Sequence, residues 1–255
     1  VYGHFFTAFS KRPVLIDGGT QNSPRTYFIY RAFATDNETL SVGIFRMLTN
    51  SGDLGYLTLN GYTGNTKETV EILNNILGVD NDAAKAILVN QYEFTDEMAD
   101  NILKYTHPNS ENTYIIVTHD IMLKTGSWIF DFGEWDFDKS SVGNITYSYR
   151  QFNISDGNLN TSDGLKMDIN SGVITWNNKT PYKLIMITDN ITTERIMDNN
   201  SDFIVFLLMN DEIAIVMDKK YENSLFTKLN IKQRNTTDFK ILYKNKRVYV
   251  WKNEN

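Results

Sequence analysis

The sequence has 255 residues, of which 41% are hydrophobic, and this composition predicts a folded protein with a sizeable core rather than a disordered chain. Its formal net charge of -6 gives no general attraction to phosphate backbones or anionic lipid headgroups, so no nucleic-acid partner is expected. The chain has no cysteine and no run of about 20 apolar residues, which excludes disulfides and thiolate metal sites and predicts no bilayer-spanning segment.

The first expected elements are a short strand and a helix. Residues 14–16 form an apolar run that ends at Asp17-Gly18-Gly19, and this pattern predicts one buried strand closed by a turn. Asn22-Ser23-Pro24 is typical of a helix start, and the helix is expected to run to about Ala34.

Further helices are expected up to about residue 105. The first begins at residues 36–39 and has apolar side chains at helical spacing, at Leu40, Ile44, Met47 and Leu48. The glycine- and tyrosine-rich stretch from residue 52 to residue 64 predicts a loop. The next helices are expected at 66–77, 81–91 and 95–105, where capping or acidic residues such as Thr66, Asp80 and Thr95 mark their starts.

Strand patterns dominate the rest of the chain. A β-branched and aromatic run at 113–118 predicts a buried strand that leads directly into residues 119–131. From about Val142, short strands divided by Asn, Asp and Gly are expected at 142–149, 164–168, 172–176, 182–187, 203–208, 212–217, 238–243 and 246–251. The pair 203–208 and 212–217 is predicted to be a hairpin, as is the pair 238–243 and 246–251.

These elements predict an α+β fold. We expect a mainly helical N-terminal lobe with a small buried sheet, residues 1–140, and an antiparallel β-rich lobe packed on it, residues 141–255.

Generic site chemistry leaves several alternatives open. His4, His107 and His119 are the only histidines, and no Gly-X-Ser-X-Gly motif is present, so a serine hydrolase is not supported. An acidic cluster is a candidate for a hard cation or simply a solvated surface; it comprises Asp131, Glu134, Asp136 and Asp138. Interleaved aromatic residues are candidates for stacking on sugars or for core anchors; they are Trp128, Phe130, Phe132, Trp135 and Phe137.

The N-terminal segment resembles the start of the C-terminal domain in bacterial and archaeal single-subunit oligosaccharyltransferases. Tyr2-Gly3-His4 is followed by an apolar, helix-like segment, by Lys11-Arg12-Pro13-Val14 and by Ile16-Asp17-Gly18-Gly19. In that family a WWDYG signature opens the domain, and a strand ending in a similar Asp-Gly-Gly follows. Here Tyr2-Gly3 matches the end of the signature, and Val1 stands where the family has Asp. Either the sequence begins inside the motif or the protein is a divergent member.

A second stretch, from Asp120 to Ile129, resembles the family's kinked helix, which carries an Asp-X-X-Lys or a Met-X-X-Ile motif. Asp120 and Lys124 are four positions apart rather than three, which is similar to an insertion-bearing variant. In the other register, Ile121, Lys124 and Trp128 take the Met/Ile positions. The alternative interpretation is an exposed ion pair between residues i and i+4 of a helix, worth only about 0.3–0.5 kcal/mol.

The resemblance implies transfer of a lipid-linked oligosaccharide to Asn in Asn-X-Ser/Thr acceptors, at the extracytoplasmic face of a multi-pass membrane protein. This chain is expected to help recognise the +2 Ser/Thr through Tyr2, Gly3, Asp120, Ile121, Lys124 and Trp128. The implied cofactor of the full-length enzyme is Mn or Mg, bound mainly by the membrane part. No catalytic or metal-binding residue is expected here, and the isolated domain is expected to be inactive.

A second class of function competes with this one. The chain is alternatively a non-enzymatic extracellular module that binds glycans or a protein partner. Its contact surface would then be the aromatic cluster around Trp128 and Trp135.

Overall fold

The computed structural model describes residues 3–11, 13–16, 24–109, 112–189, 191–245 and 247–253, and the side chains of residues 4–6, 10, 124 and 125 lie outside the described part. Contacts divide the chain into two compact units. Unit 1 comprises Val1–His119, Trp128–Gly143 and Ser224–Asn255, and unit 2 comprises Asp120–Ser127 and Asn144–Asn223. Among the described residues, no helix has both the length and the apolar character needed to cross a membrane.

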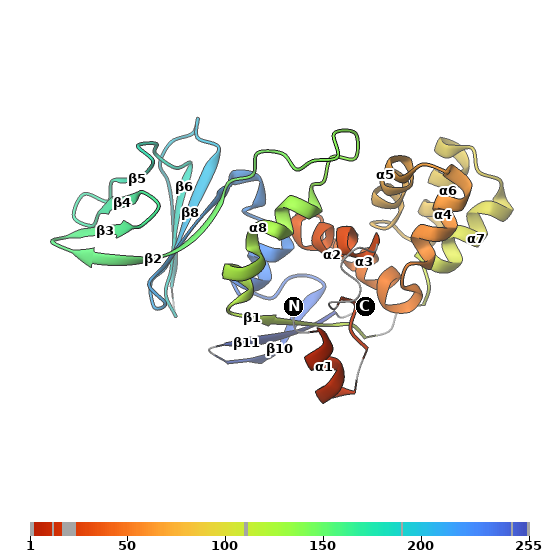
Figure 1. Ribbon diagram of the computed structural model, residues 1–255, viewed down its shortest axis with the longest axis horizontal. Coiled ribbons are helices and arrows are strands. Elements are labelled where there is room, and N and C mark those ends of the chain that lie inside the picture. Colours follow the sequence, from red (N-terminus) through yellow and green to blue (C-terminus); the bar gives the residue numbers. More distant parts are fainter. Residues whose placement is uncertain are drawn as a thin grey trace. The chain divides into compact units, whose positions relative to one another are not determined.

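Helices form most of unit 1 (Figure 1). They are α1 (Gly3–Ser10), α2 (Pro24–Ala34), α3 (Glu38–Ser51), α4 (Leu54–Thr63), α5 (Thr66–Ile76), α6 (Asn81–Tyr92) and α7 (Asp96–Thr106). Capping side chains fix four of the starts: Asn37, Asn65, Asp80 and Thr95 each accept a hydrogen bond from the backbone N–H three residues on. The helices expected from 24, from 36–39, and at 66–77, 81–91 and 95–105 are confirmed, although Asn65 rather than Thr66 caps α5.

Helix α4 occupies the stretch that was predicted to be a loop, and that prediction is wrong. The outer glycines of the stretch lie at helix ends. Gly52 donates its N–H to the carbonyl of Leu48 at the end of α3, and Gly64, with φ of 63°, closes α4. Inside α4, Gly55 packs against Met47, where an added Cβ would lie 2.6 Å from the sulfur. These glycines therefore end helices or permit close packing.

The strand predicted at residues 14–16 is also wrong, because residues 13–16 are irregular. Three apolar residues give a strand no stability without a neighbour to pair with, and Pro13 lacks a backbone donor. The carbonyl of Leu15 instead accepts a hydrogen bond from Arg25, at 3.3 Å. Asp17, Gly18 and Gly19 lie outside the described residues.

A small antiparallel sheet in the order β1-β11-β10 belongs to unit 1. Its strands are β1 (Tyr114–Thr118), β10 (Phe239–Lys244) and β11 (Val248–Asn253), and Ile116 pairs with Val250. The predicted strand at 113–118 and the predicted C-terminal hairpin are confirmed. Because β11 pairs with β1, residues 224–255 belong to unit 1, whereas the expected boundary at residue 140 placed them in the β-rich lobe.

Unit 2 contains an eight-stranded sheet in the order β5-β4-β3-β2-β9-β8-β6-β7. Its strands are β2 (Tyr147–Ser155), β3 (Asn158–Thr161), β4 (Leu165–Asp168), β5 (Ile174–Trp176), β6 (Lys183–Ile187), β7 (Thr192–Ile196), β8 (Phe203–Leu208) and β9 (Ile213–Asp218). All neighbours are antiparallel except β6 and β8. The hairpin predicted at 203–217 is confirmed as β8 and β9, with Val205 opposite Val216.

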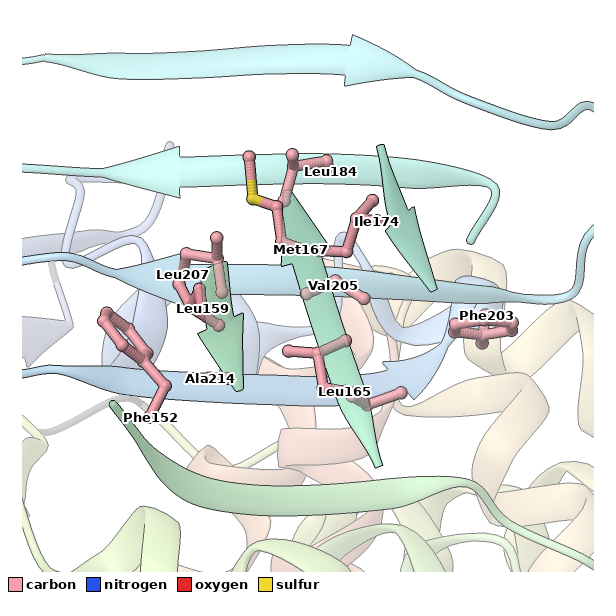
Figure 2. Close-up of a cluster of buried hydrophobic side chains, with 11 residues drawn as sticks. Phe152, Leu159, Leu165, Met167, Ile174, Leu184, Phe203, Val205, Leu207 and Ala214 are labelled. Atoms are coloured by element: carbon pink, nitrogen blue, oxygen red, sulfur yellow. The ribbon is translucent and has the colours of Figure 1, made fainter. Parts of the chain in front are cut away.

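The core of unit 2 forms because the sheet curls over itself. Figure 2 shows the short strands β3, β4 and β5 crossing over one face of the sheet formed by β6, β8 and β9. Leu165 and Ile174 from the short strands contact the same buried cluster as Val205 and Leu207 from β8. This burial explains the apolar residues on that face of the two strands, which are Phe203, Val205 and Leu207 of β8 and Ala214 and Val216 of β9.

The remaining elements complete the fold. Helix α8 (Ile121–Gly133) follows β1 after a short turn, a 3-10 turn occupies Lys219–Tyr221, and a π-helical turn occupies Thr227–Ile231. The architecture is α+β, with a helical N-terminal region and a largely antiparallel sheet, as the sequence predicted.

Candidate functional site

Helix α8 carries most of the predicted site residues. Asp120 lies in the turn before the helix and Ile121 begins it; both are half-buried. Lys124 lies in the first turns, but its side chain is outside the described part. Trp128 is 50% exposed. The helix therefore brings these four positions into one short segment.

The N-terminal half of the candidate site is less defined. Tyr2 lies outside the described residues, and Gly3 is a buried residue at the start of α1. Gly3 belongs to unit 1, whereas Asp120, Ile121 and Lys124 belong to unit 2. A shared pocket of Tyr2 and Gly3 with Lys124 therefore stays a prediction.

In unit 2, the first half of α8 packs against Tyr147 of β2. A Cβ built at Gly126 would overlap the Tyr147 phenol ring, so only glycine lets the helix and the ring come this close. The Tyr147 hydroxyl also donates a hydrogen bond to the carbonyl of Met122, at 2.9 Å. Burial raises the pKa of Tyr147 well above its usual value, so the hydroxyl keeps its proton. One tyrosine thus fixes the backbone beside Lys124.

In unit 1, the second half of α8 packs against α2 and against the segment that contains Phe226. Phe130 is fully buried and meets Phe226 edge to face, with ring centroids 5.5 Å apart. Gly133 lies against α2, where an added Cβ would lie 2.7 Å from the carbonyl oxygen of Tyr30. Phe132 is instead 39% exposed. The aromatic run therefore contains both a core anchor, Phe130, and exposed rings, and stacking of the exposed rings on sugars stays a prediction.

Three members of the acidic cluster are paired with cations within unit 1. Glu134 contacts Arg31 at 2.7 Å, Asp138 contacts Lys67 at 2.7 Å, and Asp136 contacts Lys139 at 2.8 Å. Across the described part of the chain, no three His, Cys, Asp or Glu side chains gather in a way that holds a metal ion. The expectation that this chain carries no metal-binding residue stays a prediction.

His107 has a structural position rather than a site position. It is 9% exposed at the end of α7, where its Nε2 lies 3.0 Å from the carbonyl of Ile76 and 3.2 Å from that of Val79. Desolvation, followed by the charge of Arg46, lowers the pKa of His107 to about 4. The neutral ring therefore hydrogen-bonds to backbone carbonyls at the end of α5 and in the loop that follows it.

A cleft of about 390 Å³ in unit 1 was not predicted from the sequence. Its lining comes from α2, α5, the end of α6 and the segment at the end of α8; it comprises Tyr27, Arg31, Glu71, Asn74, Asn75, Tyr92, Gly133, Glu134 and Trp135. The signal available in the sequence was the pair Asn74-Asn75, two adjacent amides inside an amphipathic helix whose buried residues are Thr69, Val70, Ile72, Leu73 and Ile76. The sequence had indicated Trp135 as a candidate for stacking on sugars or as a core anchor, and Glu134 as a member of the acidic cluster.

Comparison with known sequences relates the chain to two archaeal enzymes. It is 45% identical over 139 residues to the dolichyl-phosphooligosaccharide-protein glycotransferase of Methanococcus voltae, and 43% identical over 139 residues to the protein of that name from Methanocaldococcus jannaschii. Each match covers 53% of this chain and 15% of the relative, so the chain spans only a small share of the length of these relatives. No family model matches the chain.

Comparison with solved structures shows the same relationship at the level of the fold. The crystal structure of the C. jejuni PglB C-terminal domain superimposes with a TM-score of 0.64, covering 99% of this chain and 91% of that domain, at 16% sequence identity. Over 139 residues the chain is therefore homologous to the C-terminal part of two archaeal proteins named dolichyl-phosphooligosaccharide-protein glycotransferase, and it has the fold of the PglB C-terminal domain.

Proposed function

We propose that this chain is the globular C-terminal part of an oligosaccharyltransferase that moves a lipid-linked oligosaccharide onto the Asn of Asn-X-Ser/Thr acceptors. The observation that carries the proposal is the 45% identity over 139 residues to an enzyme named as a dolichyl-phosphooligosaccharide-protein glycotransferase. The fold supports it, because nearly the whole chain superimposes on the C-terminal domain of PglB. The partners are then an acceptor polypeptide and a lipid-linked oligosaccharide at the extracytoplasmic face of the membrane.

In this proposal, the chain binds and orients the acceptor, and the transfer chemistry belongs to a membrane part. When bound there, Mn or Mg would supply positive charge to stabilise the departing lipid phosphate. The described residues offer no group of metal ligands, so no step of the chemistry is assigned to them.

Recognition of the +2 Ser/Thr is assigned to the first half of α8, with Asp120, Ile121 and Lys124, together with Trp128 and the N-terminal Tyr2 and Gly3. A pocket that hydrogen-bonds a hydroxyl leaves buried polar groups unpaired when that hydroxyl is missing, which penalises the wrong peptide by several kcal/mol on an order-of-magnitude scale. Such a pocket works only if its groups are held in place. The contact of Gly126 with Tyr147 and the bond from Tyr147 to Met122 provide that support.

The activity is tested by glycosyl transfer from a lipid-linked oligosaccharide to matched peptides. A protein that joins this chain to its membrane part should glycosylate an Asn-X-Thr peptide and leave the Asn-X-Ala peptide unmodified. The chain alone should transfer nothing to either peptide. Transfer by the chain alone would refute the division of labour, and a complete protein that glycosylates neither peptide would refute the activity.

A further inference from the structure

We propose that the cleft between α2, α5 and the end of α8 is a saccharide-binding site. Its volume of about 390 Å³ falls within the range of small-ligand pockets, roughly 300–1,000 Å³. The proposal goes beyond the assignment of acceptor recognition to the first half of α8. Binding measurements test it independently of transferase activity.

The lining is polar and aromatic, with no aliphatic side chain among its residues. Sugar hydroxyls both donate and accept hydrogen bonds, so a saccharide needs donors and acceptors within one cleft. Amide side chains supply both from a single group. Asn75 donates to the hydroxyl of Tyr92 at 2.6 Å, and Asn74 donates to that of Tyr27 at 3.2 Å. The tyrosines thus hold both amides in fixed orientations.

Two lining residues also hold buried polar atoms with unused capacity. Within the part of the chain that the structure describes, Nε of Arg31 and Oδ1 of Asn74 have no hydrogen-bond partner. A buried donor or acceptor without a partner costs about 1–3 kcal/mol. Both atoms are shielded from solvent, so a sugar hydroxyl would pair with either of them only after the side chain shifts.

The charges of the cleft favour a neutral ligand. Arg31 is already paired with Glu134 at 2.7 Å, which leaves no free positive charge on that side chain for a phosphate. Glu71 adds a second carboxylate to the lining, and Lys67 lies 3.8 Å from it. Both carboxylates are thus paired with cations, and no unpaired cation among the described residues of the lining attracts an anion, whereas a neutral sugar would find carboxylate acceptors for its hydroxyls.

One wall of the cleft ends in a stack of aromatic rings. Trp135 stacks on Phe132, with centroids 6.4 Å apart and planes at 21°, and Phe132 stacks on Tyr30 at 5.6 Å and 26°. The stack fixes the plane of the Trp135 indole. Flat aromatic faces pack against the apolar C–H faces of sugar rings, so an indole held beside amides and carboxylates offers complementary contacts to both sides of a pyranose.

The test is a titration of the isotope-labelled chain, followed by amide and indole NMR signals. The probes are N,N′-diacetylchitobiose, cellobiose and a blocked Asn-X-Thr peptide. The two disaccharides share a ring backbone and differ in their acetamido groups. At least one of them is expected to shift the side-chain amide signals of Asn74 and Asn75 and the indole signal of Trp135.

Variants locate the binding. Trp135→Ala and Asn75→Ala should each weaken the disaccharide affinity by about tenfold or more. Asn101→Ala is the matched control for Asn75→Ala, because Asn101 forms the same bond to a tyrosine hydroxyl, that of Tyr62, at 2.9 Å but does not line the cleft. The proposal is overturned if neither disaccharide shifts the cleft signals, if only the peptide does, or if Asn75→Ala binds as tightly as Asn101→Ala.

Discussion

Gly126 of α8 lies so close to the phenol ring of Tyr147 that a Cβ at that position would overlap the ring. Mid-helix glycine normally costs about 1 kcal/mol relative to alanine, so its presence here reflects packing rather than helix preference. This contact joins a helix segment that bears candidate recognition residues to the first strand of the unit 2 sheet.

Gly126→Ala should therefore destabilise the chain by about 1–3 kcal/mol, because the new methyl group displaces Tyr147 or the helix. Gly61→Ala is the matched control, since Gly61 is also helical and has open space around its Cβ position. That control should stabilise the chain by about 0.5–1 kcal/mol. Urea denaturation of both variants checks the prediction, and a gain in stability for Gly126→Ala would contradict the close packing.

Tyr147→Phe should remove one hydrogen bond and keep the ring in place. The expected loss is about 1 kcal/mol of unfolding free energy, because the Met122 carbonyl then loses the hydroxyl that it accepts from. Urea denaturation of the variant measures the effect. Unchanged stability would show that the hydroxyl does not hold the helix.

His107 should make the stability of the chain depend on pH in the acid range. Its pKa is about 4 in the folded chain against 6.5 for an unperturbed histidine, so the unfolded chain takes up a proton first as the pH falls. The contribution of His107 to the free energy of unfolding is therefore fully present above pH 6.5. It is lost as the pH falls to 4, by about 3 kcal/mol in total.

His107→Gln tests that contribution, because glutamine keeps a donor for the carbonyls of Ile76 and Val79 but does not titrate. Denaturation curves collected from pH 7 down to pH 4 should show a smaller acid dependence in the variant than in the natural sequence. Equal pH dependence in the two proteins would assign the effect to other groups.

Local sequence patterns predicted most of the helices and the two hairpins. Capping residues such as Asp80 and Thr95 and apolar residues at helical spacing identified helices, and the two hairpins followed from short turns between apolar runs. Helix α4 was missed because Gly52, Gly55 and Gly64 signal a loop when read one at a time, whereas in the fold they end helices or allow Met47 to approach. Strands β3 and β7 are short and largely polar, so they lack the apolar pattern that predicts a strand. They form because they pair with neighbouring strands of the sheet.

Long-range pairing and three-dimensional clustering were beyond the sequence. Nothing local indicates that β11 returns to β1, which places residues 224–255 in unit 1. The family resemblance identified α8, yet the need for glycine at position 126 depends on Tyr147 of another element. The cleft likewise draws Arg31, Asn74 and Trp135 from separate segments, and only their meeting in space makes them a candidate site.

The most direct test of the proposed function is the Michaelis constant for an Asn-X-Thr peptide in the complete membrane protein, measured for Lys124→Ala and for the control Lys166→Ala. Lys166 is an exposed residue of β4 in the same unit. Lys124→Ala should raise the constant by about tenfold while its thermal unfolding stays unchanged, and Lys166→Ala should leave the constant as it is. Equal constants for the two variants would contradict the assignment of acceptor recognition to α8.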